Sequence, residues 1–132
     1  MSDQRVVHVN GVEIGNLLPA VLIAGPCQIE SKAHALEVAS ALDEICTAAG
    51  VPLIYKSSYD KANRTSAKAP RGVGMANGLA ILAEVRERFG RPVLTDVHGA
   101  EQCAPAATSR SVCRHRNAGI CNTSTASAAG LH

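Results

Sequence analysis

Residues 52–66 read PLIYKSSYDKANRTS, and they join a short apolar strand to a loop rich in cations. Lys56 ends the strand, and Lys61 and Arg64 follow within the loop. Cations together with Asn, Ser and Thr donors suit a site for phosphate or carboxylate groups, since each cation adds a charge-assisted hydrogen bond. For an isolated cluster of this kind, a solvated basic loop is the alternative interpretation.

The same strand–helix unit recurs on both sides of this stretch. The run Ala20–Gly25 predicts a strand buried on both faces, and Ser31 and Gly50 predict the two ends of the helix that follows it. In chain order, strands are expected at 20–25, 52–56 and 92–96, and helices at 32–49, 75–89 and 99–107. Strands and helices in this alternation predict βαβ crossovers and a parallel sheet, which is an α/β architecture.

The segments at the two ends of the chain differ from this pattern. Residues 6–14 predict a β-hairpin, in which Asn10-Gly11 supplies the two positive-φ positions of a type I′ turn. From Thr108 onward neither a strand period nor a helix period is visible, and a fourth strand at 109–114 is not expected. We therefore expect one domain at 1–107 and an irregular tail at 108–132.

Composition excludes several classes of protein. The net charge of +2 is too small to argue for nucleic acid or an anionic membrane as partner, and no apolar run approaches the roughly 20 residues of a membrane span. Five cysteines without a C-x-x-C pair favour reduced thiols over a disulfide framework. These features predict a cytoplasmic protein.

Chemistry-bearing residues follow each predicted strand, and the carboxyl ends of parallel strands meet at one edge of the sheet. A free cysteine such as Cys27 is more often a small core residue than a metal ligand. Asp96 and His98 could be substrate contacts, metal ligands or an acid/base pair, and a strand-end aspartate can also serve only as a cap. The candidates in chain order are Cys27, Lys56, Lys61, Asn63, Arg64, Asp96 and His98.

Three segments carry a specific resemblance, namely AGPCQIES at 24–31, KSSYDKANRTS at 56–66 and LTDVH at 94–98. They resemble 3-deoxy-D-manno-octulosonate 8-phosphate (KDO8P) synthases, and the resemblance covers residues 5–107. It implies a (β/α)8 TIM barrel preceded by a hairpin, usually a homotetramer. It also implies the condensation of phosphoenolpyruvate with D-arabinose 5-phosphate, with release of phosphate, in lipopolysaccharide biosynthesis. The Lys-Ala-Asn-Arg run at 61–64 speaks against the alternative, a related DAHP synthase.

The resemblance also implies a role for each candidate residue. Lys56 and Lys61 would hold the carboxylate and phosphate of phosphoenolpyruvate, with Ser58 beside them. Asn63, Arg64 and Asp96 would contact the sugar phosphate, and His98 would lie close to it. Lys61, Asp96 and His98 would thus be the catalytic residues, and Cys27 would be a ligand of a divalent metal, as in the metal-dependent class.

The length of the sequence conflicts with a complete barrel, which needs roughly 200–250 residues. A frameshift near codon 107, or a divergent tail, would account for the change of character there. We expect a polypeptide of these 132 residues to lack synthase activity and not to retain the metal, because one cysteine cannot replace the usual set of about three protein ligands. A non-catalytic fragment that binds phosphorylated ligands is the remaining hypothesis.

Overall fold

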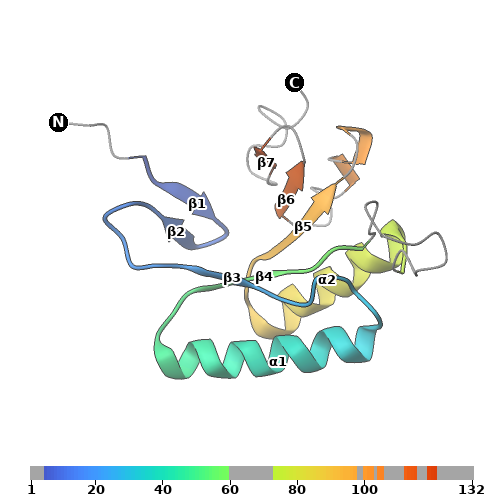
Figure 1. Ribbon diagram of the computed structural model, residues 1–132, viewed down its shortest axis with the longest axis horizontal. Helices are drawn as coiled ribbons and strands as arrows, with labels where there is room; N and C mark the ends of the chain where they lie inside the picture. Colours follow the sequence, from blue (N-terminus) through green and yellow to red (C-terminus); the bar gives the residue numbers. More distant parts are fainter. Residues whose placement is uncertain are drawn as a thin grey trace.

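The structure is a computed structural model, and it describes residues 5–59, 73–97, 100–102, 104–105, 112–115 and 119–121. Strands β1 and β2 form a two-stranded antiparallel sheet, and the other strands form a sheet in the order β3-β4-β5-β6-β7 (Figure 1). In chain order the elements are β1 (Val7–Val9), β2 (Val12–Ile14), β3 (Leu22–Ala24), α1 (Lys32–Ala49), β4 (Leu53–Lys56), α2 (Met75–Phe89), β5 (Val93–Val97), the 3-10 turn η1 (Ala100–Gln102), β6 (Val112–His115) and β7 (Gly119–Cys121).

Local signals mark both ends of α1 and the end of α2. Ser31 caps α1, because its Oγ accepts a hydrogen bond from the His34 amide at 3.1 Å. Gly50 and Gly90 end α1 and α2 in the left-handed region, at φ 68° and 65°. The predicted helices at 32–49 and 75–89 are therefore confirmed.

The N-terminal hairpin is also confirmed. Asn10 and Gly11 have φ values of 44° and 88°, the positive values that a type I′ turn requires. Val9 is buried and packs with Ile54 and Leu94 from the larger sheet. The hairpin thus covers the apolar part of one face of that sheet.

The opposite face of the sheet carries the main core. Figure 1 shows α1 and α2 together on this side of the strands. Alternate residues of β4 and β5, among them Tyr55, Val93 and Val97, are buried against the helices. The intervening residues Ile54 and Leu94 face the hairpin, so the two faces of the sheet have separate apolar clusters.

One expectation about the first strand of this sheet is wrong. Leu22 and Ile23 in β3 are 41% and 45% exposed, whereas burial on both faces was predicted. The reason is topological, since β3 ends the sheet and pairs with β4 alone in the part of the chain that the structure describes. Ile45 in α1 is likewise 63% exposed.

The expectation that no fourth strand forms at 109–114 is also wrong, whereas most of the expected irregular tail at 108–132 lies outside the described residues. Strand β6 pairs in parallel with β5, and β7 pairs antiparallel with β6. The edge of β5 offers backbone N–H and C=O groups that a neighbouring segment can pair with, and this pairing does not require an apolar period.

A helix was expected at 99–107. In this segment the structure shows η1 and a helical Ala104–Pro105, while the other residues lie outside its description.

A helix that crosses a membrane needs about 20 consecutive, predominantly apolar residues. Neither α1 nor α2 combines the length and the apolar character that such a crossing needs. This finding concerns the described residues alone.

Candidate active site at the strand ends

Three of the predicted site residues lie together where β4 and β5 end. Asp96 Oδ2 lies 3.4 Å from Lys56 Nζ and accepts a hydrogen bond from Ser58 Oγ at 3.2 Å. Lys56 pairs in register with Leu94, two residues before Asp96, so Lys56 and Asp96 lie on the same face of the sheet. The structure thus brings together charged groups that are 40 residues apart in the sequence.

The ion pair is partly shielded from solvent, with 27% of the Lys56 side chain and 29% of the Asp96 side chain exposed. An ammonium group has three N–H donors, so Lys56 can contact a ligand anion while Asp96 stays beside it. Ser58 is buried at the same point and fixes the Asp96 carboxylate. This arrangement suits a ligand that carries both an anionic group and hydroxyl groups.

The turn after β3 is held against the end of β4. The Ser58 amide donates to the Cys27 carbonyl at 3.3 Å, and the Ile29 amide donates to the Ser58 carbonyl at 2.9 Å. Gly25 makes a close approach possible, because a Cβ there would overlap the Lys56 carbonyl oxygen. Pairing between the two segments therefore continues beyond the strands themselves.

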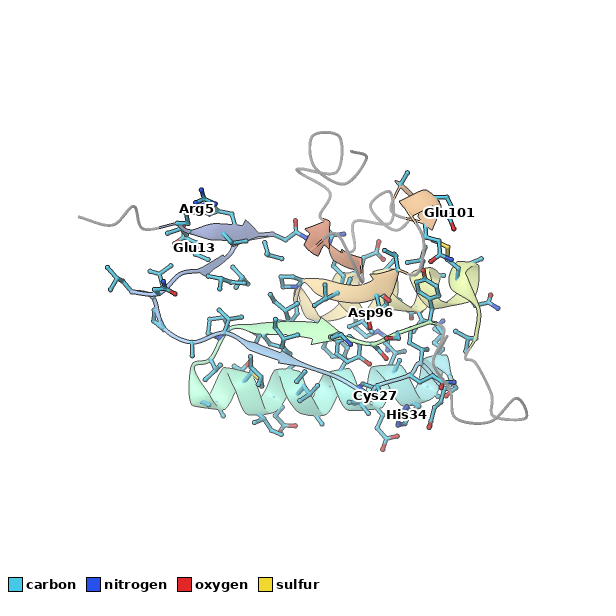
Figure 2. All side chains as sticks on the ribbon, turned by 45° about the horizontal axis from the view of Figure 1, so that its top comes forward. Arg5, Glu13, Cys27, His34, Asp96 and Glu101 are labelled. Carbon is cyan, nitrogen blue, oxygen red and sulfur yellow. The ribbon has the colours of Figure 1, made fainter. Side chains whose placement is uncertain are left out.

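Cys27 lies in this turn, as predicted, and its thiol is exposed and free (Figure 2). Among the described residues, no three His, Cys, Asp or Glu side chains are grouped so that they could hold a metal ion. The described part of the chain therefore offers one soft ligand and not a complete metal site.

Several predicted site residues lie outside the description of the structure. They are Lys61, Asn63, Arg64 and His98. Their predicted contacts with phosphate and sugar groups stay predictions. The described part of the site consists of Lys56, Ser58 and Asp96, with Cys27 in the adjoining turn.

Two buried polar residues next to the site, Ser57 and Tyr59, were not predicted from the sequence. Ser57 is fully buried and donates a hydrogen bond to the Pro26 carbonyl at 2.7 Å. Tyr59 is 1% exposed, and its hydroxyl donates to Gln102 Oε1 at 2.7 Å, which links the loop after β4 to η1. Extending the alternation of β4 past Lys56 would have placed both on the helix-facing side with Tyr55.

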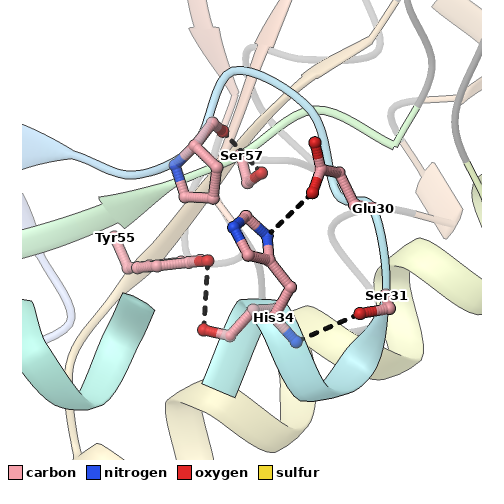
Figure 3. Close-up of polar contacts among 7 residues, drawn as sticks. Glu30, Ser31, His34, Tyr55 and Ser57 are labelled. Carbon is pink, nitrogen blue, oxygen red and sulfur yellow. Dashed lines mark hydrogen bonds and ion pairs between the residues drawn. The ribbon is translucent and has the colours of Figure 1, made fainter. Parts of the chain in front are cut away.

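Tyr55 is the largest fully buried side chain near the site. Its hydroxyl donates to the Ala35 carbonyl in α1 at 3.4 Å (Figure 3). Burial disfavours the charged phenolate and raises the pKa of Tyr55 from 10.0 to about 12. Tyr55 is therefore neutral near pH 7 and has a structural role.

The sequence of this chain matches a family model and several known proteins. The family model described as the DAHP synthetase I family matches residues 3–114. A 2-dehydro-3-deoxyphosphooctonate aldolase of Rhodopseudomonas palustris (strain BisB5) is 64% identical over 102 residues, which are 77% of this chain and 36% of that protein. A protein of the same name from Granulibacter bethesdensis is 62% identical over 103 residues, or 78% of this chain and 36% of the relative. The chain thus spans about a third of the length of the curated relatives it matches.

Proposed function

We propose that this chain, which belongs to the DAHP synthetase I family, forms part of a KDO8P synthase active site. This part lies at the ends of the first strands of the parallel sheet. KDO8P synthase is another name for 2-dehydro-3-deoxyphosphooctonate aldolase. The proposed reaction condenses phosphoenolpyruvate with D-arabinose 5-phosphate, gives KDO8P and phosphate, and belongs to lipopolysaccharide biosynthesis. The observation that carries the proposal is the Lys56–Asp96–Ser58 cluster at the strand ends.

Within this site, each described residue has a proposed task that follows from its chemistry. Lys56 binds an anionic group of phosphoenolpyruvate, since a partly shielded ammonium forms stronger charge-assisted bonds than a fully solvated one. Asp96 orients Lys56 and accepts hydrogen bonds from hydroxyl groups of the sugar phosphate. Ser58 holds the Asp96 carboxylate in place.

The remaining predicted residues complete the proposal, although they lie outside the described residues. Lys61 binds the second anionic group of phosphoenolpyruvate, and Asn63 and Arg64 bind the sugar phosphate. His98 follows Val97, the last residue of β5, in the sequence, and we propose that it acts close to the reacting groups. In this proposal Lys61, Asp96 and His98 are the catalytic residues.

A divalent metal is also proposed, with Cys27 as one of its ligands. An exposed, free thiol at a strand end fits one ligand position, while the other ligands are not among the described residues. Such a metal polarises an oxygen or orients a water molecule. We further propose a homotetramer and a cytoplasmic location, in which the free thiols Cys27 and Cys46 stay reduced.

The proposal is tested with a chimera, because this chain spans about a third of its relatives. Residues 1–107 of this chain are joined to the remaining part of the R. palustris aldolase. The purified chimera is given phosphoenolpyruvate, D-arabinose 5-phosphate and a divalent metal. We expect phosphate release together with a product that has the mass of KDO8P. A chimera that unfolds cooperatively but forms no KDO8P would contradict the proposal, and a DAHP-type product would identify the related synthase.

Variants of the chimera assign the roles. Replacing Lys56 by Met is expected to lower kcat/KM about 100-fold or more, the usual cost of losing a charged transition-state contact. Ser40→Ala is the matched control, since Ser40 is exposed on α1 and its loss should leave kcat/KM unchanged. Removing the metal with EDTA should abolish activity, and Cys27→Ala should weaken metal binding.

A further inference from the structure

The buried hydroxyl of Ser57 lies between two residues of the candidate site, Lys56 and Ser58. Ser57 is 0% exposed, and its Oγ donates to the Pro26 carbonyl at 2.7 Å, the usual length of an O–H···O hydrogen bond (Figure 3). The Ser57 amide donates in the other direction, to the Leu94 carbonyl of β5 at 3.2 Å. Ser57 thus joins the turn after β3 to the neighbouring strand on the far side of β4.

We name the paired segments 25–29 and 56–58 the strand-end seam. Two backbone hydrogen bonds cross it, from the Ser58 amide to Cys27 and from the Ile29 amide to Ser58. Gly25 lies against the Lys56 carbonyl at the start of the seam. The side chain of Ser57 adds a bond at Pro26, where the backbone has no N–H of its own.

This bond determines how the turn leaves the seam. It fixes the Pro26 carbonyl, and the peptide plane that contains this carbonyl also contains the backbone nitrogen of Cys27. Beyond the turn, Glu30 Oε2 lies 3.6 Å from His34 Nδ1, and Ser31 caps α1 (Figure 3). The turn is therefore held at both ends, and Ser57 holds the end nearer to Lys56.

We infer that Ser57 is a positioning residue, which holds the Cys27 turn and the Lys56 end of β4 in one fixed arrangement. The proposed function is needed only for the second part of this inference, namely that the arrangement serves to bind substrate and metal. Its physical basis is the hydrogen bond from the buried Ser57 hydroxyl to the Pro26 carbonyl. Removing the hydroxyl takes this hydrogen bond away from the Pro26 carbonyl.

Amide hydrogen exchange of the 132-residue chain tests the inference without requiring catalysis. In Ser57→Ala, the amides of Ile29 and Ser58 are expected to exchange about tenfold faster, which corresponds to one lost hydrogen bond. The amides of α1 and α2 should keep their rates. Ser57→Thr retains the hydroxyl and is expected to restore the protection of both seam amides.

Thr95→Ala is the matched control for this experiment. Thr95 is fully buried on the adjacent strand, and its hydroxyl has no hydrogen-bond partner within the described residues. Its removal should leave the seam amides protected. Unchanged exchange at Ile29 and Ser58 in Ser57→Ala, equal acceleration along the whole chain, or no rescue by Thr would each overturn the inference.

A second measurement connects the seam to the reaction. In the chimera, Ser57→Ala is expected to raise KM for phosphoenolpyruvate severalfold while the midpoint of thermal unfolding stays within a few degrees. An unchanged KM would overturn the link to substrate positioning. If the unmodified chimera makes no product while the exchange result holds, the proposed function fails and the role of Ser57 in the seam stands.

Discussion

Gly25 makes the closest backbone approach near the candidate site. A Cβ at this position would overlap the Lys56 carbonyl oxygen, and a backbone atom cannot move aside as a flexible side chain can. We predict that Gly25→Ala lowers the free energy of unfolding by about 2 kcal/mol or more, the usual cost of forced overpacking. Urea denaturation measures this change.

Gly15 provides the control for that prediction. A Cβ at Gly15 would meet its nearest neighbours, in Leu18 and Val6, at 3.4 Å, which is at the limit of ordinary contact. Gly15→Ala should therefore change the free energy of unfolding by less than about 1 kcal/mol. Equal effects of the two substitutions would contradict the close approach described at Gly25.

We predict that the free energy of unfolding depends on pH through Tyr55. Its pKa is about 12 in the folded chain and 10.0 in the reference state, because burial disfavours the phenolate. Its contribution to stability is fully present below pH 10 and is lost as the pH rises toward 12, since only the unfolded state releases the proton there. The slope approaches roughly 1.4 kcal/mol per pH unit.

The measurement compares urea unfolding of the wild type and Tyr55→Phe between pH 9 and 12. At pH 8 the variant should lose about 1 kcal/mol through the missing bond to Ala35. Above pH 10 the difference in the free energy of unfolding should shrink. Parallel curves for the two proteins across the whole pH range would rule out the raised pKa.

At this scale, sequence reasoning found the residues whose position follows from the strand ends. Lys56 and Asp96 were placed together because parallel strands end at one edge, and Ser58 was placed beside Lys56 only through the family resemblance. Ser57 was missed, because alternation past Lys56 predicts only that its side chain faces the helices and not which group its hydroxyl contacts. Its role depends on contact with Pro26, 31 residues earlier in the chain, which spacing alone does not reveal.

Among the elements, α1 shows most clearly how local chemistry fixes a boundary. Ser31 accepts a hydrogen bond from the His34 amide, which would otherwise be unpaired in the first turn. We predict that Ser31→Ala lowers the free energy of unfolding by about 1 kcal/mol. Chemical denaturation followed by circular dichroism at 222 nm measures the change.

Ser40→Ala is the matched substitution within the same helix. Ser40 is exposed in the middle of α1, where alanine is the better helix former, so this variant should be equally or slightly more stable than the wild type. A loss of stability at Ser40 as large as at Ser31 would show that the cap has no special role.

Helix ends were predictable because their signals lie within a few residues of each boundary. The strands show the opposite case. The exposure of Leu22 in β3 depends on which element lies beyond the sheet edge. The formation of β6 depends on the backbone N–H and C=O groups that β5 offers for pairing. Neither dependence is visible in the apolar period of the segment itself.

In the molecule as a whole, one edge of the large sheet carries exposed apolar residues. Ile23 in β3 is 45% exposed, and β3 pairs with β4 alone among the described strands. Such an edge favours association with another copy of the chain. We predict that a polypeptide of these 132 residues self-associates with increasing concentration, and that Ile23→Lys reduces this association.

Leu17→Lys separates the edge from general surface hydrophobicity. Leu17 is 80% exposed but lies outside β3, so its replacement should leave most of the association in place. Light scattering across a concentration series measures both variants. An equal reduction by the two substitutions would argue against pairing at the β3 edge.

We propose that the ends of β3, β4 and β5 form the phosphoenolpyruvate side of a KDO8P synthase site. A crystal structure of the chimera with bound phosphoenolpyruvate tests this claim most directly. We expect an anionic oxygen of the ligand within about 3 Å of Lys56 Nζ, the length of a charge-assisted hydrogen bond, with Asp96 beside it. Phosphoenolpyruvate bound elsewhere, without contact to Lys56, would contradict the claim.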